Sequence, residues 1–330
     1  MMLTDSFGRG HNYLRISLTE RCNLRCFYCM PPGGIALSPP DSIMTASEIE
    51  KIAGVFVKLG VTKIRLTGGE PLVRKDFEDI AQRLSKLNVE IALSTNGILI
   101  DQYLHTFKST GIRKINVSLD TLNKTKFSDI TRRDYFTRVL NNIGLLIENG
   151  FFPKINVVII KGVNDNELME FVELTRKWPV TVQFIEFMPF AGNKWDLTKT
   201  VPAKTMLEDI RESYGVTELL KIQDQPHDTS CKYKIKTYPG SFGFISTISN
   251  PFCDSCNRIR LTANGRIKNC LFSQEETNLL ESLRRKEPVE QLIIDSVRYK
   301  KAQRGGINNF TDEQGKKLVN VNRSMVTIGG

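Results

Sequence analysis

Short apolar or alternating runs recur along roughly the first 190 residues, and segments with helical spacing separate them. The runs that predict strands are residues 13–17, 63–67, 90–94, 114–118, 154–160 and 181–187. The segments that predict helices include residues 46–59, 77–87, 138–149 and 167–177. Strands that alternate with helices across short loops predict a parallel sheet with helices outside it. Six such units predict an α/β fold, a partial (β/α)6 TIM-like barrel.

Four of the predicted strands end in small or polar residues. These ends are Gly68-Gly69-Glu70-Pro71, Thr95-Asn96-Gly97, Ser118-Leu119-Asp120 and Phe187-Met188-Pro189. Any one of them alone is explained by turn chemistry, because Gly, Asn and Pro are common in loops. In βα barrels the carboxyl ends of the strands build the active site. Four such ends on one edge therefore predict a site there.

The βα pattern stops after about residue 190. Residues 233–236 and 242–246 flank Pro239-Gly240 and predict a hairpin. A second strand pair is predicted at 258–261 and 266–270, and helices at 275–285 and 289–299. We therefore expect two domains, with residues 1–195 as the partial barrel and residues 196–330 as a C-terminal region of short strands and helices.

Length and composition indicate a soluble globular chain. The 330 residues are 40% hydrophobic and 25% charged, and no apolar run is long enough to span a bilayer. The N-terminus lacks the apolar stretch of a secretory signal, so we expect a cytoplasmic location. The net charge of +10 favours an anionic partner, although a solvated basic face would explain it equally well.

Six of the seven cysteines form two triplets. Cys22, Cys26 and Cys29 have the spacing C-x3-C-x2-C, and Cys253, Cys256 and Cys270 lie near the end, whereas Cys231 stands alone. In a reducing compartment such clusters favour metal binding or redox chemistry over disulfides. Structural zinc requires four ligands, whereas three thiolates suit a four-iron cluster with one open iron. Zinc with a distant fourth ligand remains an alternative.

The first triplet, with Tyr28 before its last cysteine, resembles the signature of the radical S-adenosylmethionine (SAM) enzymes. Gly68-Gly69-Glu70-Pro71 resembles the family's GGE motif, which contacts the methionine amino group. The resemblance implies that Cys22, Cys26 and Cys29 hold a [4Fe-4S] cluster whose open iron binds SAM. It also implies that SAM yields a 5′-deoxyadenosyl radical. The cofactor contacts that it implies are Tyr28, Gly68, Gly69, Ser118 and Met188.

The second triplet borders a basic stretch. Arg258 and Arg260 would point to the same face of a strand, because side chains alternate with period two. Arginine binds phosphate with two parallel hydrogen bonds. The stretch therefore predicts an anionic ligand beside the second metal site, with a solvated basic strand as the alternative.

Long runs of the chain resemble the GTP 3′,8-cyclases of molybdenum cofactor biosynthesis. Among them are RLTGGEPLVR, VSLDTLNKTKFSDITRRD, GFISTISNPFCDSCNRIRLTANGRIKNCLF and the final MVTIGG. The resemblance implies a lyase in which the radical takes the 3′-hydrogen of GTP to give 3′,8-cyclo-7,8-dihydro-GTP. It implies a second [4Fe-4S] cluster on Cys253, Cys256 and Cys270. The GTP contacts that it implies are Arg15, Arg65, Thr95, Lys154, Arg258, Ile259 and Arg260, with Lys161 as a rival to Lys154.

The same resemblance implies further roles and partners. The terminal Gly329 and Gly330 would enter the active site. The product would pass to cyclic pyranopterin monophosphate synthase, a flavodoxin- or ferredoxin-like protein would donate electrons, and the chain would form a homodimer. Segments 228–231 and 299–306 depart from the family pattern. We expect them to affect loop contacts and dimer packing rather than the chemistry.

Two alternatives remain at this point. One is another radical SAM enzyme with an auxiliary iron–sulfur cluster. The other is a zinc-bearing nucleic-acid-binding protein, which would show four-ligand sites and aromatic residues among its basic runs. Aromatic residues make up 8% of the chain and do not interleave with the basic runs. We therefore expect neither nucleic acid nor a membrane as a partner.

Overall fold

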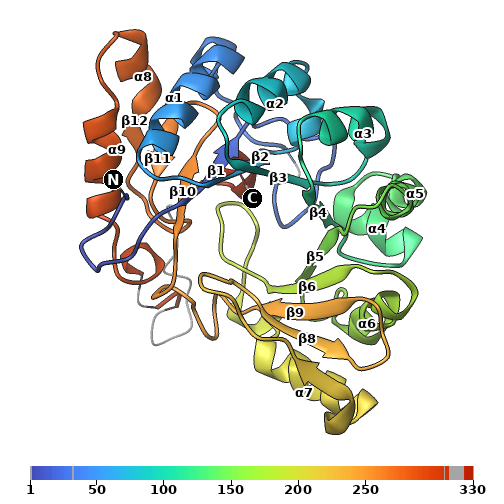
Figure 1. Cartoon of the computed structure of the whole chain (residues 1–330). Helices are drawn as coiled ribbons and strands as arrows, with labels where there is room; N and C mark the ends of the chain where they lie inside the picture. Colours follow the sequence, from blue (N-terminus) through green and yellow to red (C-terminus); the bar gives the residue numbers. More distant parts are fainter. Residues whose placement is uncertain (1, 32, 308, 312–322, 330) are drawn as a thin grey trace.

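A twelve-stranded sheet organises the computed structural model, which describes residues 2–31, 33–307, 309–311 and 323–329. The strand order is β12-β11-β10-β1-β2-β3-β4-β5-β6-β9-β8-β7. The first six strands are β1 (Tyr13–Ser17), β2 (Lys63–Thr67), β3 (Glu90–Thr95), β4 (Lys114–Ser118), β5 (Lys154–Ile159) and β6 (Thr181–Glu186). They are parallel neighbours in chain order. They form the arc of an open barrel, as the sequence predicted (Figure 1).

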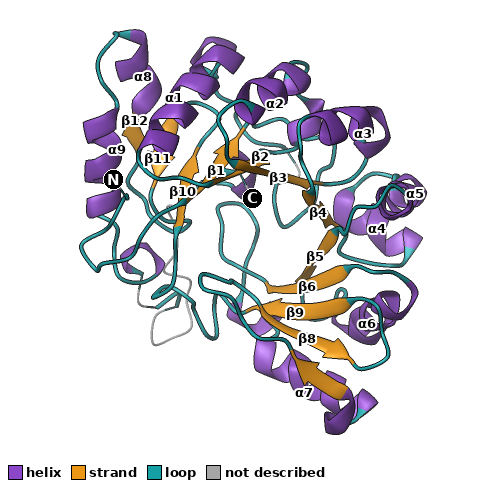
Figure 2. Cartoon of the chain, viewed as in Figure 1, coloured by secondary structure: helices purple, strands orange, loops and turns teal. Residues whose placement is uncertain are grey.

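Helices cover the outside of this arc (Figure 2). They are α1 (Ala46–Lys58), α2 (Phe77–Ser85), α3 (Ile100–Ser109), α4 (Lys124–Thr131), α5 (Phe136–Glu148) and α6 (Leu168–Lys177). Helix α1 begins with a capping box, in which Thr45 accepts from the Glu48 amide and the Glu48 carboxylate accepts from the Thr45 amide. The sequence prediction missed α3 and α4.

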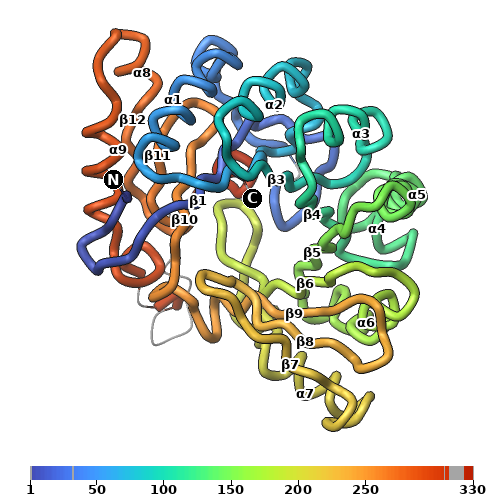
Figure 3. Tube along the Cα trace, viewed as in Figure 1, coloured from blue at the N-terminus to red at the C-terminus, as the bar shows by residue number. Residues whose placement is uncertain are grey.

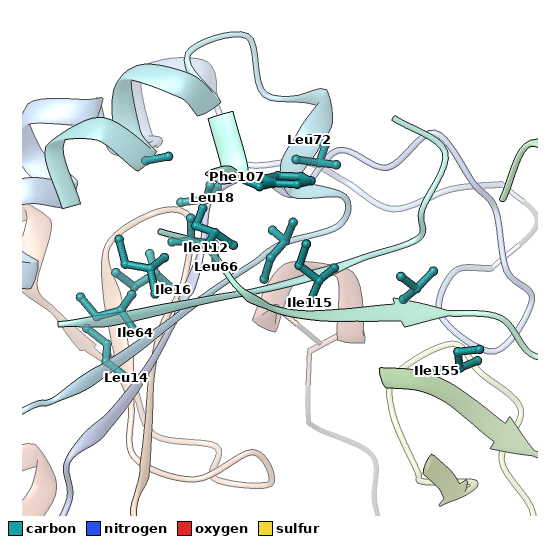
Figure 4. Close-up of a cluster of buried hydrophobic side chains, with 14 of the residues drawn as sticks. Leu14, Ile16, Leu18, Ile64, Leu66, Leu72, Phe107, Ile112, Ile115 and Ile155 are labelled. Atoms are coloured by element: carbon teal, nitrogen blue, oxygen red, sulfur yellow. The ribbon is translucent and has the colours of Figure 1, made fainter. Parts of the chain in front are cut away.

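The core lies between the arc and its outer helices. Leu14 and Ile16 of β1 and Ile64 and Leu66 of β2 are fully buried there, together with Phe107 of α3 (Figure 4). Because side chains alternate along a strand, the residues between them point to the inside of the arc. The strands β1 and β2 therefore each have an apolar outer face, and Arg15 and Arg65 lie on their inner faces.

The C-terminal region extends the arc at both edges. β9 (Ser241–Ile245) pairs parallel with β6, and β10 (Arg258–Leu261) pairs parallel with β1. The outermost strands β7 (Leu219–Lys221), β8 (Cys231–Ile235), β11 (Arg266–Lys268) and β12 (Thr277–Asn278) are antiparallel. One sheet thus crosses the predicted domain boundary at residues 195 and 196, and the division itself stays a prediction.

Three C-terminal helices longer than four residues complete the described chain: α7 (Ala203–Tyr214), α8 (Leu279–Arg284) and α9 (Glu290–Arg298). The prediction of a helix at 275–285 was wrong at its start. Thr277 and Asn278 pair with β11, and Asn278 then caps α8 by accepting from the Glu281 amide. Among the described residues, no helix is long and apolar enough to cross a membrane.

Candidate active site

The first cysteine triplet lines a cavity of about 140 Å³ at the carboxyl ends of β2, β3 and β4. Its walls include Cys22, Cys26, Cys29, Tyr28, Gly68, Gly69, Thr95, Asn96, Ser118, Asp120, Asn156, Met325 and Val326. Four of the predicted cofactor contacts, Tyr28, Gly68, Gly69 and Ser118, therefore share one cavity with the triplet. Three soft thiol donors without histidine suit an iron–sulfur cluster.

Glycines let the loop after β2 press against the cysteine loop. The Gly69 amide donates to the Thr19 carbonyl at 2.7 Å, and the Glu70 amide donates to the Arg21 carbonyl at 2.8 Å. A Cβ atom on Gly69 would lie 2.4 Å from the Arg21 carbonyl oxygen, which is rigid main chain. Only glycine allows this approach.

Glu70 connects the ends of β2 and β3. Its buried carboxylate accepts from the Thr95 hydroxyl at 2.7 Å, the Asn96 amide at 2.6 Å and the Leu72 amide at 3.0 Å. Burial raises the pKa of Glu70 to about 7, although these hydrogen bonds act to lower it. The carboxylate thus supports the loops, and the main chain of Gly68 and Gly69 is what faces the cavity.

Burial dominates the electrostatics of the first triplet. It raises the pKa of Cys22 to about 11, with Glu70 adding to the effect, and it also raises the pKa of Cys26 and Cys29. Among the described residues, no three His, Cys, Asp or Glu side chains stand close enough to share one metal ion. The thiols instead surround a cavity, an arrangement that fits a group wider than a single ion.

Tyr28 is fixed by Asp120. Its hydroxyl donates to the Asp120 carboxylate at 2.5 Å, and the other carboxylate oxygen accepts from the Val158 amide at 2.8 Å. Burial raises the pKa of Asp120 to about 6. Asp120 was noted at a strand end but was not predicted as a site residue.

A second cavity of about 540 Å³ occupies the inside of the arc. Strand register brings three cations to one level of its wall, because Arg15 of β1 is paired with Arg65 of β2 and with Arg260 of β10. Arg258 lies two residues before Arg260 on β10, opposite Tyr13. Burial, then Arg65 and Arg258, lower the pKa of Arg15 to about 10 against the opposing effect of Tyr13. Cations crowded in this way indicate a site for a multivalent anion.

Lys154 faces the same cavity from β5, and its pKa is lowered by burial and by Lys232 and Arg65. Its rival Lys161 is exposed and borders a separate surface pocket. Lys154 thus lines the same cavity as the arginines and Lys161 does not, and the role of Lys154 as a GTP contact stays a prediction. Asn116, Asn156 and Gln183 also line the large cavity and were missed, because polar strand residues without charge give no signal in the sequence.

The second triplet lies in the wall of the large cavity, which Cys253, Cys256 and Cys270 all line. Burial would raise the pKa of Cys256, but Arg258 and Lys300 outweigh it and lower the pKa to about 6. The Lys300 ammonium lies 3.3 Å from the Cys256 sulfur, and the Arg304 amide lies 3.4 Å from the Cys253 sulfur. These three thiols also fit an iron–sulfur group.

The C-terminal segment reaches the point where the cavities adjoin. Met325 of α10 (Met325–Ile328) and Asn156 line both cavities. Arg260 donates to the Gly329 carbonyl at 2.6 Å, and the Ser324 hydroxyl donates to the Cys29 carbonyl at 2.6 Å. Helix α10, at the red end of the tube, lies inside the arc in Figure 3. Gly330 lies outside the described residues.

Three residues that were predicted to contact GTP or SAM do not present their side chains beside the other residues predicted for the same ligand. Thr95 lines the first cavity, apart from the cationic row, whereas Met188 lines the large one. The Ile259 side chain is buried in the core, so only its main chain is available to a ligand. Their roles stay predictions.

The segments that depart from the family pattern border the large cavity, and their expected effect on loop contacts and dimer packing stays a prediction. Asp228 and Thr229 line the large cavity, as do Lys300 and Arg304. Asp228 and Thr229 precede β8, and Lys300 and Arg304 follow α9.

The fold and the three-cysteine loop define a radical SAM protein. Residues 16–175 match the radical SAM superfamily, and residues 180–305 match the family described as Molybdenum Cofactor Synthesis C. The crystal structure of Streptococcus suis SuiB bound to S-adenosylmethionine shares the fold, with a TM-score of 0.64 and 17% identity. The match covers 92% of this chain and 69% of that one.

Comparison with sequence relatives identifies the family more narrowly than the fold does. The mitochondrial GTP 3′,8-cyclase of Arabidopsis thaliana is 44% identical, over 100% of this chain and 84% of the relative. The GTP 3′,8-cyclase of Peptoclostridium acidaminophilum is 40% identical, over 100% and 98%. The chain spans about half the length of human molybdenum cofactor biosynthesis protein 1, at 43% identity over 96% of this chain and 50% of the relative. The chain belongs to the GTP 3′,8-cyclase family of radical SAM enzymes.

Proposed function

We propose that the chain converts GTP to 3′,8-cyclo-7,8-dihydro-GTP in molybdenum cofactor biosynthesis. One observation carries the proposal: two cavities, each with its own three cysteines, adjoin at Asn156 and Met325, and the larger one is lined by cations. When bound, an iron–sulfur cluster and SAM supply the 5′-deoxyadenosyl radical that takes the 3′-hydrogen of GTP. The arrangement would place the two reactants at one junction.

In the first cavity, Cys22, Cys26 and Cys29 would hold a [4Fe-4S] cluster. Gly68 and Gly69 would present main-chain groups to the methionine end of SAM, because the Glu70 side chain is occupied by the loops. Tyr28, held by Asp120, and Ser118 would line the rest of the cofactor site. Met188 would contact the cofactor from the large cavity.

In the large cavity, the triphosphate would lie along Arg15, Arg65, Lys154, Arg258 and Arg260. Guanidinium groups held on neighbouring strands need little rearrangement to bind phosphate oxygens, so binding loses little entropy. The guanine would lie toward Cys253, Cys256 and Cys270, which would hold the second [4Fe-4S] cluster. The ribose would then lie between them, toward the junction with the first cavity.

The C-terminal segment would close this junction. Gly329 lies against Ser17 and Thr67, and Arg260 holds its carbonyl. A segment in this position would keep water and other hydrogen donors from the reacting carbon. Gly330 would continue the same segment. The next enzyme, cyclic pyranopterin monophosphate synthase, would take the product, a flavodoxin- or ferredoxin-like protein would supply electrons, and the chain would act as a homodimer.

An anaerobic assay tests the proposal. The full chain is reconstituted with iron and sulfide, reduced with dithionite, and given SAM with GTP, with ATP or with no nucleotide. We expect release of 5′-deoxyadenosine that depends on GTP and is lost when Cys22, Cys26 and Cys29 are replaced by serine. Release that ignores GTP would keep a radical SAM enzyme and reject the cyclase.

A further inference from the structure

Lys300 is a buried lysine outside the predicted site residues. It follows α9, is 3% exposed, and points its ammonium at the second cysteine triplet. The ammonium lies 3.3 Å from the Cys256 sulfur and donates to the Arg258 carbonyl at 2.9 Å. Its neighbour Lys301 is exposed. Lys300 is thus buried beside the second triplet, whereas the side chain of the next lysine faces the solvent.

Burying an ammonium is costly unless an anion or several hydrogen bonds compensate. Within the part of the chain that the structure describes, the Lys300 ammonium contacts one carbonyl oxygen and one sulfur. A neutral thiol is a weak acceptor, so the compensation is strong only when that sulfur is anionic. A thiolate that binds iron is such a sulfur.

Other donors reinforce the positive surroundings of the triplet. The Arg258 guanidinium lies 3.8 Å from the Cys256 sulfur and is held over the Phe252 ring, 4.6 Å from its centroid. The Arg304 amide approaches the Cys253 sulfur from the segment that follows Lys300. Among the described residues, no ammonium donates to the Cys22 sulfur, which accepts from the Leu24 main-chain amide and the Asn96 side-chain amide.

We propose that Lys300 is a positioning residue that acts through Cys256 and raises the reduction potential of the iron–sulfur cluster at the second triplet. The proposal rests on the proposed function, which supplies that cluster. Reduction adds negative charge, and a buried cation that donates to a cluster sulfur stabilises the reduced form. The second site would thereby accept an electron more readily than the first.

The geometry also allows a second role for Lys300, because this residue lines the large cavity. A lysine there could bind the triphosphate of GTP directly. The two roles differ in their readouts. A substrate ligand changes the KM for GTP and leaves the potential of the GTP-free protein unchanged, whereas a residue that tunes the cluster changes the potential without any nucleotide.

The experiment measures the potential of the second cluster alone. In the full chain, Cys22, Cys26 and Cys29 are replaced by serine, and the protein is reconstituted anaerobically without GTP. Lys300→Met, Lys300→Gln and Lys300→Arg are compared with this parent and with Lys301→Met, the same change at the adjacent exposed lysine. Iron and sulfide are counted, and the midpoint potential is followed by EPR during a redox titration.

We expect the neutral variants K300M and K300Q to shift the midpoint to more negative values, with K300R and K301M close to the parent. An unchanged midpoint in variants that retain their iron would overturn the proposal and leave the proposed function intact. Loss of iron from every neutral variant would also overturn it and make Lys300 a residue that retains the cluster. A parent without iron would overturn both proposals.

Discussion

At the residue scale, positive charge is concentrated in the wall of the large cavity, where few negative groups offset it. Arg15, Arg65 and Arg260 occupy one level of three adjacent strands, and burial lowers the pKa of Arg260 well below its usual range, with Arg15 and Arg258 adding to the effect. Like charges in a site of low dielectric repel one another strongly. The free protein therefore carries an electrostatic cost that a bound polyanion removes.

Inorganic triphosphate should therefore stabilise the protein. At a concentration of about 100 times its Kd, a ligand raises the free energy of unfolding by about 2.7 kcal/mol. Arg15→Met should lose most of this gain and leave the ligand-free protein at least as stable, because a buried charge is removed. Arg176→Met, on an exposed arginine of α6, is the control. Thermal unfolding with and without triphosphate measures both, and an equal gain in R15M would contradict the placement of the anion.

Tyr13 gives the large cavity a pH dependence. Burial would raise its pKa, but Arg65 and Arg15 lower it to about 8, and its hydroxyl accepts from Arg65 Nε at 2.6 Å. Between pH 8 and 10 the unfolded chain keeps the phenol proton that the native protein has lost, so native stability should rise with pH across this window. The phenolate also adds negative charge to an anion site.

We therefore expect the KM for GTP to rise above pH 8 in the parent protein and to stay flatter in Tyr13→Phe. The same variant should not gain stability between pH 8 and 10. Steady-state kinetics and urea unfolding at several pH values measure the two effects. Parallel pH profiles for the two proteins would show that Tyr13 does not titrate in this range.

At the element scale, the loop after β2 depends on contacts between main chains. Gly69→Ala would place a Cβ atom 2.4 Å from the Arg21 carbonyl oxygen, so the cysteine loop must move. We expect reduced iron content at the first site and loss of activity. Gly54→Ala is the matched control, because its Cβ meets nothing within 4 Å and helix α1 should gain up to about 1 kcal/mol. Normal iron content in G69A would show that the cysteine loop does not depend on its close contact with Gly69.

The C-terminal segment is equally restricted. Gly329 has φ of +85°, and a Cβ there would lie 2.6 Å from the Thr67 hydroxyl oxygen and 2.8 Å from the Ser17 Cβ. Gly329→Ala, or one residue added after Gly330, should lower turnover strongly while both iron–sulfur sites stay loaded. Activity and iron content are measured on the same sample. Full turnover in either variant would show that the C-terminal segment is not part of the active site.

The elements show what sequence pattern can and cannot predict. The six barrel strands were correctly predicted because their apolar residues face helices and their ends carry Gly, Asn or Asp. Helix α3 was missed because polar residues dominate its length, and burial of Ile100, Thr106 and Phe107 becomes visible only in the fold. Strand β12 was read as helix because two residues that pair with β11 leave no periodicity.

At the scale of the whole molecule, the site is formed where the C-terminal region extends the arc at both of its edges. The spacing of the cysteines predicted which thiols lie together. The first triplet lies within a single loop, and in the second triplet a short hairpin brings the last cysteine back to the first two. The pairing of β10 with β1 was not predictable from pattern, yet it aligns Arg260 with Arg15. For the same reason Asp228, Lys300 and Met325 were missed, because only tertiary packing brings them to the cavity.

The central claim is that one hydrogen atom passes from the ribose of GTP, bound in the large cavity, to the adenosyl group of SAM, bound in the first cavity. GTP labelled with deuterium at C3′ tests it in a single anaerobic turnover. The account predicts 5′-deoxyadenosine that carries one deuterium, and none when the label is at C2′ instead. Unlabelled 5′-deoxyadenosine from 3′-deuterated GTP would contradict the account, even if GTP still stimulated its release.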